Sequence, residues 1–259
     1  MDPAEPPAVD DAPASAMPAL RTLALSAPRR WLAAGWRDFR RAPAIGLFFG
    51  ACFVAMGWAL LAVFEYAPAY TLALSAGFLL SGPFLCLGLY RVSQRLERGE
   101  RPTLVDAMLA WRERGGAMAI FGLVLLVLEL VWGRAALVIF AVSFDGMPDF
   151  RGSLLALLDP ANLGFIVAWT TVGAIFATLI YAISAVSIPM ILHRRSDAIS
   201  AGLTSLRLVS TQPAVMALWA AAIVALVGLA LLPGFAGLLL AGPVVGHASW
   251  HAYREAVAD

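Results

Sequence analysis

The sequence predicts an all-α, polytopic membrane protein with six transmembrane helices in three hairpins, each preceded by a short amphipathic interfacial helix. Three observations lead to this fold class. The 259 residues are 61% hydrophobic and 14% charged, whereas soluble domains are about half apolar and about a quarter charged. Six apolar stretches reach about 20 residues, the length that crosses a hydrocarbon core of about 30 Å. Sixteen of the 18 basic residues, all of them Arg, lie in the links on one side of these stretches.

The chain is expected to divide into a tail and one membrane domain. Residues 1–20 read MDPAEPPAVDDAPASAMPAL, which is acidic and rich in Pro and Ala, with no apolar core after it. This composition predicts a disordered cytoplasmic tail rather than a cleaved signal peptide. Residues 21–259 are expected to form a single six-span membrane domain.

The six spans are expected at residues 43–64, 69–90, 116–134, 164–192, 213–232 and 234–251. The links at 65–68 and 232–234 are so short that they force antiparallel hairpins. The link between the third and fourth spans is long, and we expect an outer loop in which residues 152–159, GSLLALLD, lie on the membrane surface.

The arginines predict the orientation, because basic residues next to spans are retained on the cytoplasmic side. Arg134 and Arg151 fall in or next to the outer link. The others flank the opposite ends of the spans, and they are Arg21, Arg29, Arg30, Arg37, Arg40, Arg41, Arg91, Arg95, Arg98, Arg101, Arg112, Arg114, Arg194, Arg195, Arg207 and Arg254. Both termini are therefore predicted to be cytoplasmic.

A three-fold repeat is indicated before and within each hairpin. Each hairpin follows a basic stretch with apolar residues at relative positions 0, +4 and +7, namely Leu32, Trp36, Phe39; Leu104, Met108, Trp111; and Ile199, Leu203, Leu206. Such stripes predict helices that lie at the membrane interface. Each returning span also has a proline in its inner half, at Pro83, Pro189 and Pro243, which predicts a kink. In carriers, kinked helices at equivalent positions often surround a substrate site, whereas in structural bundles they help helices wrap around one another.

Two charges lie inside the apolar run LVLELVWGRAALVIF, residues 124–138. If the third span begins near Gly116, Arg134 lies about 27 Å along its axis, so its head reaches the outer boundary. Glu129 lies at about 20 Å, below the interface. We expect Glu129 to face the bundle interior, to be protonated, or to pair with Thr170 or Thr171. A pair with Arg134 is poor, because residues five apart on a helix point about 140° from each other.

The strongest candidate for a ligand site is GHASWHAYREAV near the C-terminus. His247, His251 and Glu255 recur at every fourth residue and share one helix face. Two imidazoles and a carboxylate at this spacing suit a divalent metal, and neutral His also suits haem. His193 ends the fourth span at the same level. The alternative is that these are ordinary interfacial residues.

Other chemical signatures are missing from the sequence. It has no phosphate-binding Gly-rich loop, no nucleophile elbow and no zinc-binding cysteine set. Cys52 and Cys86 are expected at different depths, which disfavours a disulfide. We therefore expect a protein that is not an enzyme and that has no cofactor, except for a metal or haem at His247, His251 and Glu255, which we call the histidine stripe. Its arginines are expected to contact anionic lipid rather than nucleic acid.

Three segments carry a resemblance to a known family: FLLSGPFLCLGLYRVSQRLERGE, AISAVSIPMILHRRSDAISAGLTSLRLVSTQPAVMALW and GPVVGHASWHAYREAV. From about Trp31 to the C-terminus the chain resembles the bacterial integral membrane family catalogued as domain of unknown function 2189. The resemblance implies a Gram-negative inner-membrane protein. It implies no reaction and assigns no functional residues.

Three functional hypotheses follow. A non-enzymatic membrane component, such as a scaffold or an assembly partner for other membrane proteins, fits the scarcity of polar residues in the spans and the basic interfacial stretches. A carrier or channel for small solutes or lipid fits the proline-kinked repeats and Glu129. A haem- or metal-binding membrane protein fits His247, His251 and Glu255.

Overall fold

The computed structural model describes residues 17–66, 71–143 and 162–258. The predicted tail up to residue 16, the last two residues of the predicted turn at 65–68 and the predicted surface stretch at 152–159 lie outside the described residues. Every element within them is helical, apart from one isolated bridge, so the all-α class is confirmed. The elements are α1 Ala27–Arg41, α2 Pro43–Tyr66, α3 Thr71–Glu97, α4 Leu104–Met108, the 3-10 helix η2 Ala110–Arg114, α5 Gly115–Ser143, α7 Leu163–Ser184, α8 Ser187–Arg194, α9 Ala198–Thr211, α10 Pro213–Leu231 and α11 Leu238–Ala256.

Four stretches are long and apolar enough to cross a membrane. Within the described residues they are Pro43–Val63, Leu104–Ser143, Leu163–Arg194 and Pro213–Leu231. These correspond to the first, third, fourth and fifth predicted spans. The second predicted span falls in α3 and the sixth in α11. Both helices form, but α3 continues into the polar residues 91–97 and α11 carries His247, His251 and Arg254.

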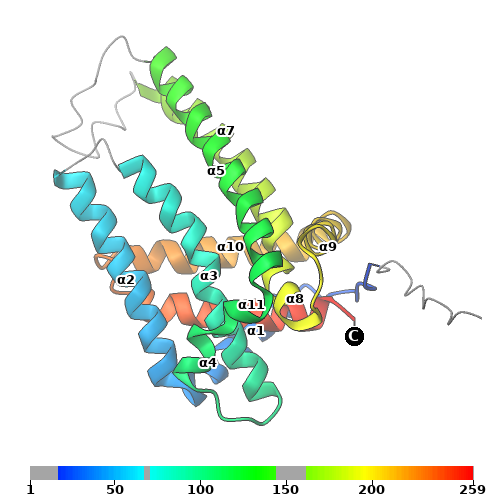
Figure 1. Cartoon of the computed structure of the whole chain (residues 1–259). Coiled ribbons are helices and arrows are strands. Elements are labelled where there is room, and N and C mark those ends of the chain that lie inside the picture. Colours follow the sequence, from blue (N-terminus) through cyan, green and yellow to red (C-terminus); the bar gives the residue numbers. More distant parts are fainter. Residues whose placement is uncertain (1–16, 67–70, 144–161, 259) are drawn as a thin grey trace, which may run out of the picture.

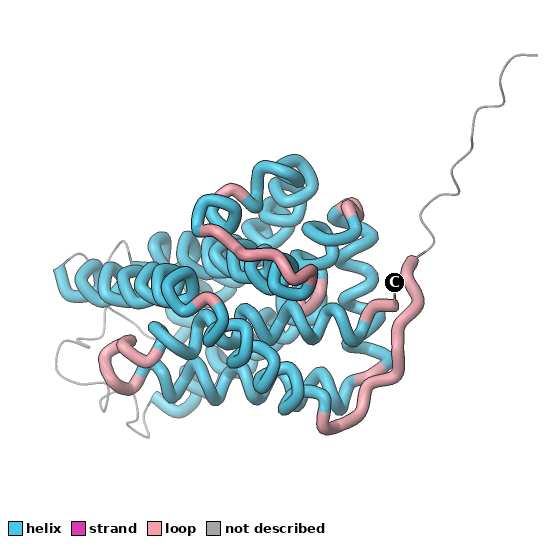
Figure 2. Tube along the Cα trace, turned by 90° about the horizontal axis from the view of Figure 1, so that it is seen from below, coloured by secondary structure: helices cyan, strands magenta, loops and turns pink. Residues whose placement is uncertain are grey.

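Two ordered segments extend beyond the boundaries that the sequence predicted. The third span was expected to end at residue 134, but α5 continues to Ser143, because AALVIFAVS is apolar and contains no Gly or Pro. Residues 17–20 were assigned to the disordered tail. In the structure Leu20 forms an antiparallel bridge with Val257, and the Ala258 N–H bonds the Ala19 carbonyl at 2.9 Å. Figure 2 shows this segment passing the C-terminal end of the chain.

The three prolines do not act alike. The helices α3 and α11 run through Pro83 and Pro243 without interruption. The fourth predicted span is instead divided into α7 and α8, and Pro189 lies in the first turn of α8. Proline has no N–H to bond the carbonyl four residues back, which here belongs to Ala185 at the end of α7.

Helix α9 stabilises the break between α7 and α8. Ser205 accepts a hydrogen bond from the Val186 N–H at 3.4 Å and donates one to the Ala182 carbonyl at 2.7 Å. Ser187 donates to the Ala201 carbonyl at 3.0 Å. Backbone N–H and carbonyl groups at the break thus form hydrogen bonds with side chains, as buried backbone groups require.

The helix α11 is the centre of the packing. It packs along α1, α2 and α3, while α5 pairs with α7. In Figure 1, α2, α3, α5 and α7 run in a similar direction, and α10 and α11 lie across them. The largest fully buried side chains include Trp31, Trp219, Trp250 and Tyr253. The described core is therefore concentrated around α11 and the short helices.

The predicted interfacial stretches are helical, as α1, α4 with η2, and α9. Most of their stripe residues are exposed on the protein surface, including Trp36, Trp111 and Ile199. Leu32 and Leu104 are half-buried. Phe39 is buried, because α1 has a second, buried face against α11 that includes Trp31 and Asp38. This second face was not predicted.

Candidate functional site

Each member of the histidine stripe on α11 bonds a different partner. His247 shares a hydrogen bond of 2.8 Å between its Nδ1 and the Ser93 hydroxyl of α3. One turn later, His251 donates from Nε2 to the Asp38 carboxylate of α1, also at 2.8 Å. The stripe thus ties α11 to two neighbouring helices.

The last member of the stripe, Glu255, is bound from α1. Its carboxylate accepts a hydrogen bond from the Trp31 indole at 2.9 Å and forms an ion pair with Arg30. No group of three or more His, Cys, Asp or Glu suited to a metal ion occurs in the described part of the chain. The metal or haem site at His247, His251 and Glu255 therefore stays a prediction, without a convergent ligand set.

The fourth residue considered for that site, His193, lies elsewhere. Its Nδ1 is 2.8 Å from the Tyr253 hydroxyl, and its ring meets Trp250 edge to face with centroids 5.6 Å apart. It therefore packs with the aromatic residues of α11.

Asp38 is the buried charged residue of the first cluster, which consists of the histidine stripe and its partners on α1 and α3. Burial by itself raises the pKa of the Asp38 carboxyl, but hydrogen bonds from His251 and Ser93, together with the charge of His251, outweigh it. The pKa of Asp38 therefore lies below its ordinary value. The carboxylate form is stabilised by the same contact that holds α1 on α11.

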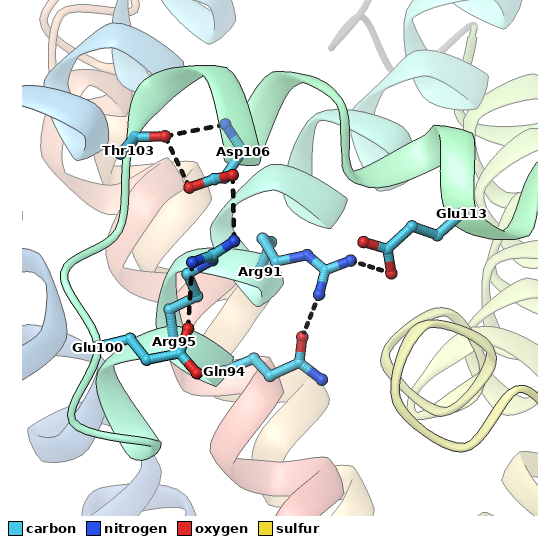
Figure 3. Close-up of polar contacts among 7 residues, drawn as sticks. All are labelled: Arg91, Gln94, Arg95, Glu100, Thr103, Asp106 and Glu113. Carbon is cyan, nitrogen blue, oxygen red and sulfur yellow. Dashed lines mark hydrogen bonds and ion pairs between the residues drawn. The ribbon is translucent and has the colours of Figure 1, made fainter.

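A second cluster surrounds the C-terminal half of α3 (Figure 3). The Arg91 guanidinium donates to the Gln94 side chain at 2.7 Å and forms an ion pair with Glu113 of η2. Arg95 bonds Glu100 and Asp106, each at 3.1 Å. The two arginines thus connect α3 to the loop that follows it, to α4 and to η2.

Asp106 is positioned by the start of α4. The Thr103 hydroxyl donates to its carboxylate at 2.7 Å and accepts from its backbone N–H at 3.1 Å, which caps the helix. The hydrogen bond from Thr103 and the nearby Arg95 hold the pKa of Asp106 below its ordinary value. The carboxylate is therefore charged at neutral pH and available to Arg95.

A polar cavity of about 280 Å³ opens beside this cluster, between α3, η2 and the end of α8. Its lining residues are Arg91, Gln94, Arg95, Arg98, Glu100, Glu113, Leu192, His193 and Arg195. Arginine is the commonest residue in this lining, whereas the sequence predicted for these arginines only a topological role and contacts with anionic lipid.

A larger cavity of about 550 Å³ lies on the other side of α3 and is apolar. Helices α2, α3, α4 and η2 line it with Phe48, Phe49, Cys52, Phe84, Leu85, Leu87, Gly88, Ala107, Met108 and Trp111. It contains no group that could act as an acid, a base or an anion ligand, apart from the Cys52 thiol. Its chemistry is that of a lipid-facing cleft.

The two charges inside the third predicted span have different surroundings. Glu129 is buried in α5 with 8% of its surface exposed, as expected for a residue that faces the bundle. Its proposed partners Thr170 and Thr171 are exposed, and its carboxyl group forms no hydrogen bond or ion pair within the described residues. Arg134 is exposed on the surface of α5, and its position at the outer boundary stays a prediction.

Sequence reasoning missed the partners of both clusters. Asp38, Ser93 and Gln94 are buried polar residues. The i, i+3 and i+4 spacing of Arg91, Gln94 and Arg95 was visible as one polar helix face. Asp38 carried no such signal, because its partner lies 213 residues away in the sequence.

The family comparison bears on this region. The model of a family described as predicted integral membrane protein, DUF2189, matches residues 70–193. Residues 70–193, called the DUF2189 region below, are thus similar to this family. Neither the curated proteins nor the solved structures gave a match. The DUF2189 match is shorter than the resemblance that was expected from about Trp31 to the C-terminus.

The DUF2189 region runs from α3 nearly to the end of α8. It contains the cluster of Arg91, Arg95 and Glu113, and also Glu129. The helices α1 and α11, which carry Asp38 and the histidine stripe, lie outside the matched residues. The second cluster is thus the candidate site that belongs to the DUF2189 region.

Proposed function

We propose that this integral membrane protein is a non-enzymatic component of the bacterial inner membrane that acts as a scaffold or assembly partner for other membrane proteins. The observation that carries the proposal is the use of its buried polar residues. In the described helices, Asp38, Ser93, Gln94 and His247 bond other side chains of the protein. The contacts of Asp38, Ser93 and His247 join α11 to α1 and α3, while Gln94 positions Arg91 within α3.

A further part of the proposal is that the chain spans the membrane six times, with both termini in the cytoplasm. If α3 did not cross the membrane, the arginines between α3 and α5 would lie on the outer side. This would be unusual, because basic residues next to spans are retained on the cytoplasmic side. The 27 residues of α3 span about 40 Å, which is enough to cross. Helix α11 is less apolar than the four long apolar stretches. We attribute this to its surroundings, because protein rather than lipid covers much of α11, including His247.

Cysteine labelling tests this topology. Single cysteines at Ala33, Arg101, Ser210 and Leu232, in a background with Cys52 and Cys86 replaced by Ala, are treated with a membrane-impermeant maleimide in intact spheroplasts. We expect labelling at Leu232 alone, and labelling of the other three only after lysis. Labelling that placed Ala33 and Arg101 on opposite sides would show that α3 does not cross, and would contradict the six-span topology.

Native mass spectrometry of the protein, extracted at native expression level in mild detergent, tests the scaffold function. We expect the chain with a second protein at a fixed ratio, with or without phospholipid. The matched control is the same extraction after overexpression, in which a genuine partner becomes substoichiometric. A haem or metal mass lost in the His247→Ala variant would instead support the cofactor hypothesis, and a chain without any protein partner would contradict the scaffold.

A carrier for small solutes or lipid is the second candidate, and the buried carboxyl of Glu129 favours it. On this alternative, proteoliposomes transport protons, or move phospholipid between leaflets, faster than empty liposomes. A pH-sensitive dye in the lumen measures proton transport, and a fluorescent phospholipid that reacts with external dithionite measures lipid movement. Glu129→Gln is expected to abolish the excess rate, because a buried ionisable group in a span marks a transport path. Glu65→Gln, on the exposed end of α2, is the control. Wild-type rates equal to those of empty liposomes would eliminate the carrier.

A further inference from the structure

The polar cavity between α3, η2 and α8 has an excess of positive charge. Four arginines and two glutamates line it. The two glutamates are engaged, because Glu113 pairs with Arg91 and Glu100 pairs with Arg95. The side chains of Arg98 and Arg195 form no hydrogen bond or ion pair with the described part of the chain. The cavity wall therefore presents two guanidinium groups whose charge the protein does not neutralise.

Contacts within the protein position two of the arginines of the cavity. Arg91 is almost fully buried, and Gln94 and Glu113 hold its guanidinium from two directions. Arg195 has a positive φ of 58°, a left-handed conformation that is uncommon outside glycine. Arg114 donates a hydrogen bond to the Arg195 carbonyl, which holds this conformation and so fixes where the Arg195 side chain leaves the backbone. The site is thus organised before any ligand arrives.

We propose that this cavity binds a phosphate-bearing anion. Guanidinium groups bind phosphate oxygens through paired, charge-assisted hydrogen bonds, and arginine provides the planar geometry for this contact. The cavity is polar and of limited size, so it suits a phosphate group better than a large organic anion.

Two sources provide this chemistry, a phospholipid headgroup and a soluble phosphate compound. The apolar stretch Leu163–Arg194 ends at the cavity, since Leu192, His193 and Arg195 line it. The cavity therefore lies where an apolar helix leaves the hydrocarbon region, at the depth of lipid phosphates. The inference does not depend on the scaffold function or on the number of spans, because it is tested on purified protein.

Paired charge-removal variants test the site. The site variant combines Arg98→Gln with Arg195→Gln, which removes both unneutralised cations. The control variant combines Arg37→Gln with Arg207→Gln, which removes two exposed arginines of α1 and α9 that do not line the cavity. Both variants change the net charge equally, and Arg195→Gln keeps a side chain at the left-handed position.

Two probes are applied to the delipidated full-length protein in detergent. Inorganic phosphate is titrated in a thermal-shift assay at constant ionic strength, and phosphatidylglycerol retention against phosphatidylcholine is measured by native mass spectrometry. We expect wild-type protein to bind at least one probe and the site variant to bind it at least about tenfold more weakly, since hydrogen bonds to charged groups contribute more than neutral ones. The control variant is expected to change binding by less than about twofold, because distant surface charges are screened.

The outcomes are distinct. Binding of inorganic phosphate that the site variant loses identifies a soluble phosphate ligand, and loss of phosphatidylglycerol retention alone identifies the headgroup. Failure of wild-type protein to bind either probe, equal losses in the control variant, or unchanged binding in the site variant would overturn the proposal. If the site variant does not fold, Arg98→Lys combined with Arg195→Lys replaces it, with intermediate affinity expected because lysine keeps the charge but not the paired geometry.

Discussion

Gly35→Ala is expected to destabilise the protein, although alanine is the better helix former. At Gly35 the backbones of α1 and α11 touch, and a Cβ atom would lie 2.6 Å from the Val244 carbonyl oxygen and 2.7 Å from the Ala248 nitrogen. Both neighbours are backbone atoms, so a change of rotamer cannot relieve the overlap. Overpacking of this kind costs about 1–3 kcal/mol, against a helix-propensity gain of about 1 kcal/mol.

Thermal unfolding in detergent measures this effect. We expect a lower Tm for Gly35→Ala and a further fall for Gly35→Leu, with a shift of about 2–4 °C for each kcal/mol in a protein of this size. Gly228→Ala in α10 is the matched control, because nothing lies within 4 Å of the added Cβ. It is expected to leave Tm unchanged or raise it. A rise in Tm for Gly35→Ala would show that α1 does not pack this closely on α11.

His251→Leu is the second change with a large expected effect, because it removes the partner of a buried carboxylate. Asp38 is only 5% exposed, and His251 donates its hydrogen bond at 2.8 Å. Breaking a buried pair by removing one partner costs about 3–5 kcal/mol. The double variant Asp38→Leu with His251→Leu is expected to recover most of this loss, since it leaves no unpaired charge.

The pH dependence of the same variant has a definite sign. In the wild-type protein the pKa of Asp38 is lowered, so its contribution to stability is present above pH 3.8 and is lost as the pH falls through the lowered value. In His251→Leu the hydrogen bond from Ser93 is the main contact left to oppose burial, so we expect the pKa of Asp38 to rise above its unfolded value. The variant should then lose stability as the pH rises from 4 to 7. Denaturation curves across this range measure the loss, and the double variant is the control. A pH-independent loss would contradict the role given to the carboxylate.

Composition and periodicity were sufficient for the class of fold. Runs such as 43–64 and 213–232 predicted helices that the structure contains almost unchanged, because helix formation in an apolar run depends on local hydrogen bonding. The stripes at Met108 and Ile199 likewise predicted the short helices. Boundaries were less certain, as α5 shows, because an apolar sequence continues past the membrane boundary without a stop signal.

The sequence by itself determined that this is a helical membrane protein, where its apolar helices lie and that most of its arginines fall in links at one end of the predicted spans, since these follow from short-range patterns. Only the tertiary structure decided what the polar residues do. It assigned His251 to Asp38 and His247 to Ser93, and brought Arg98 and Arg195 to one cavity. The physical reason is that a hydrogen bond or a cavity depends on which helices are neighbours, and an apolar surface that faces lipid has the same composition as one that faces another helix.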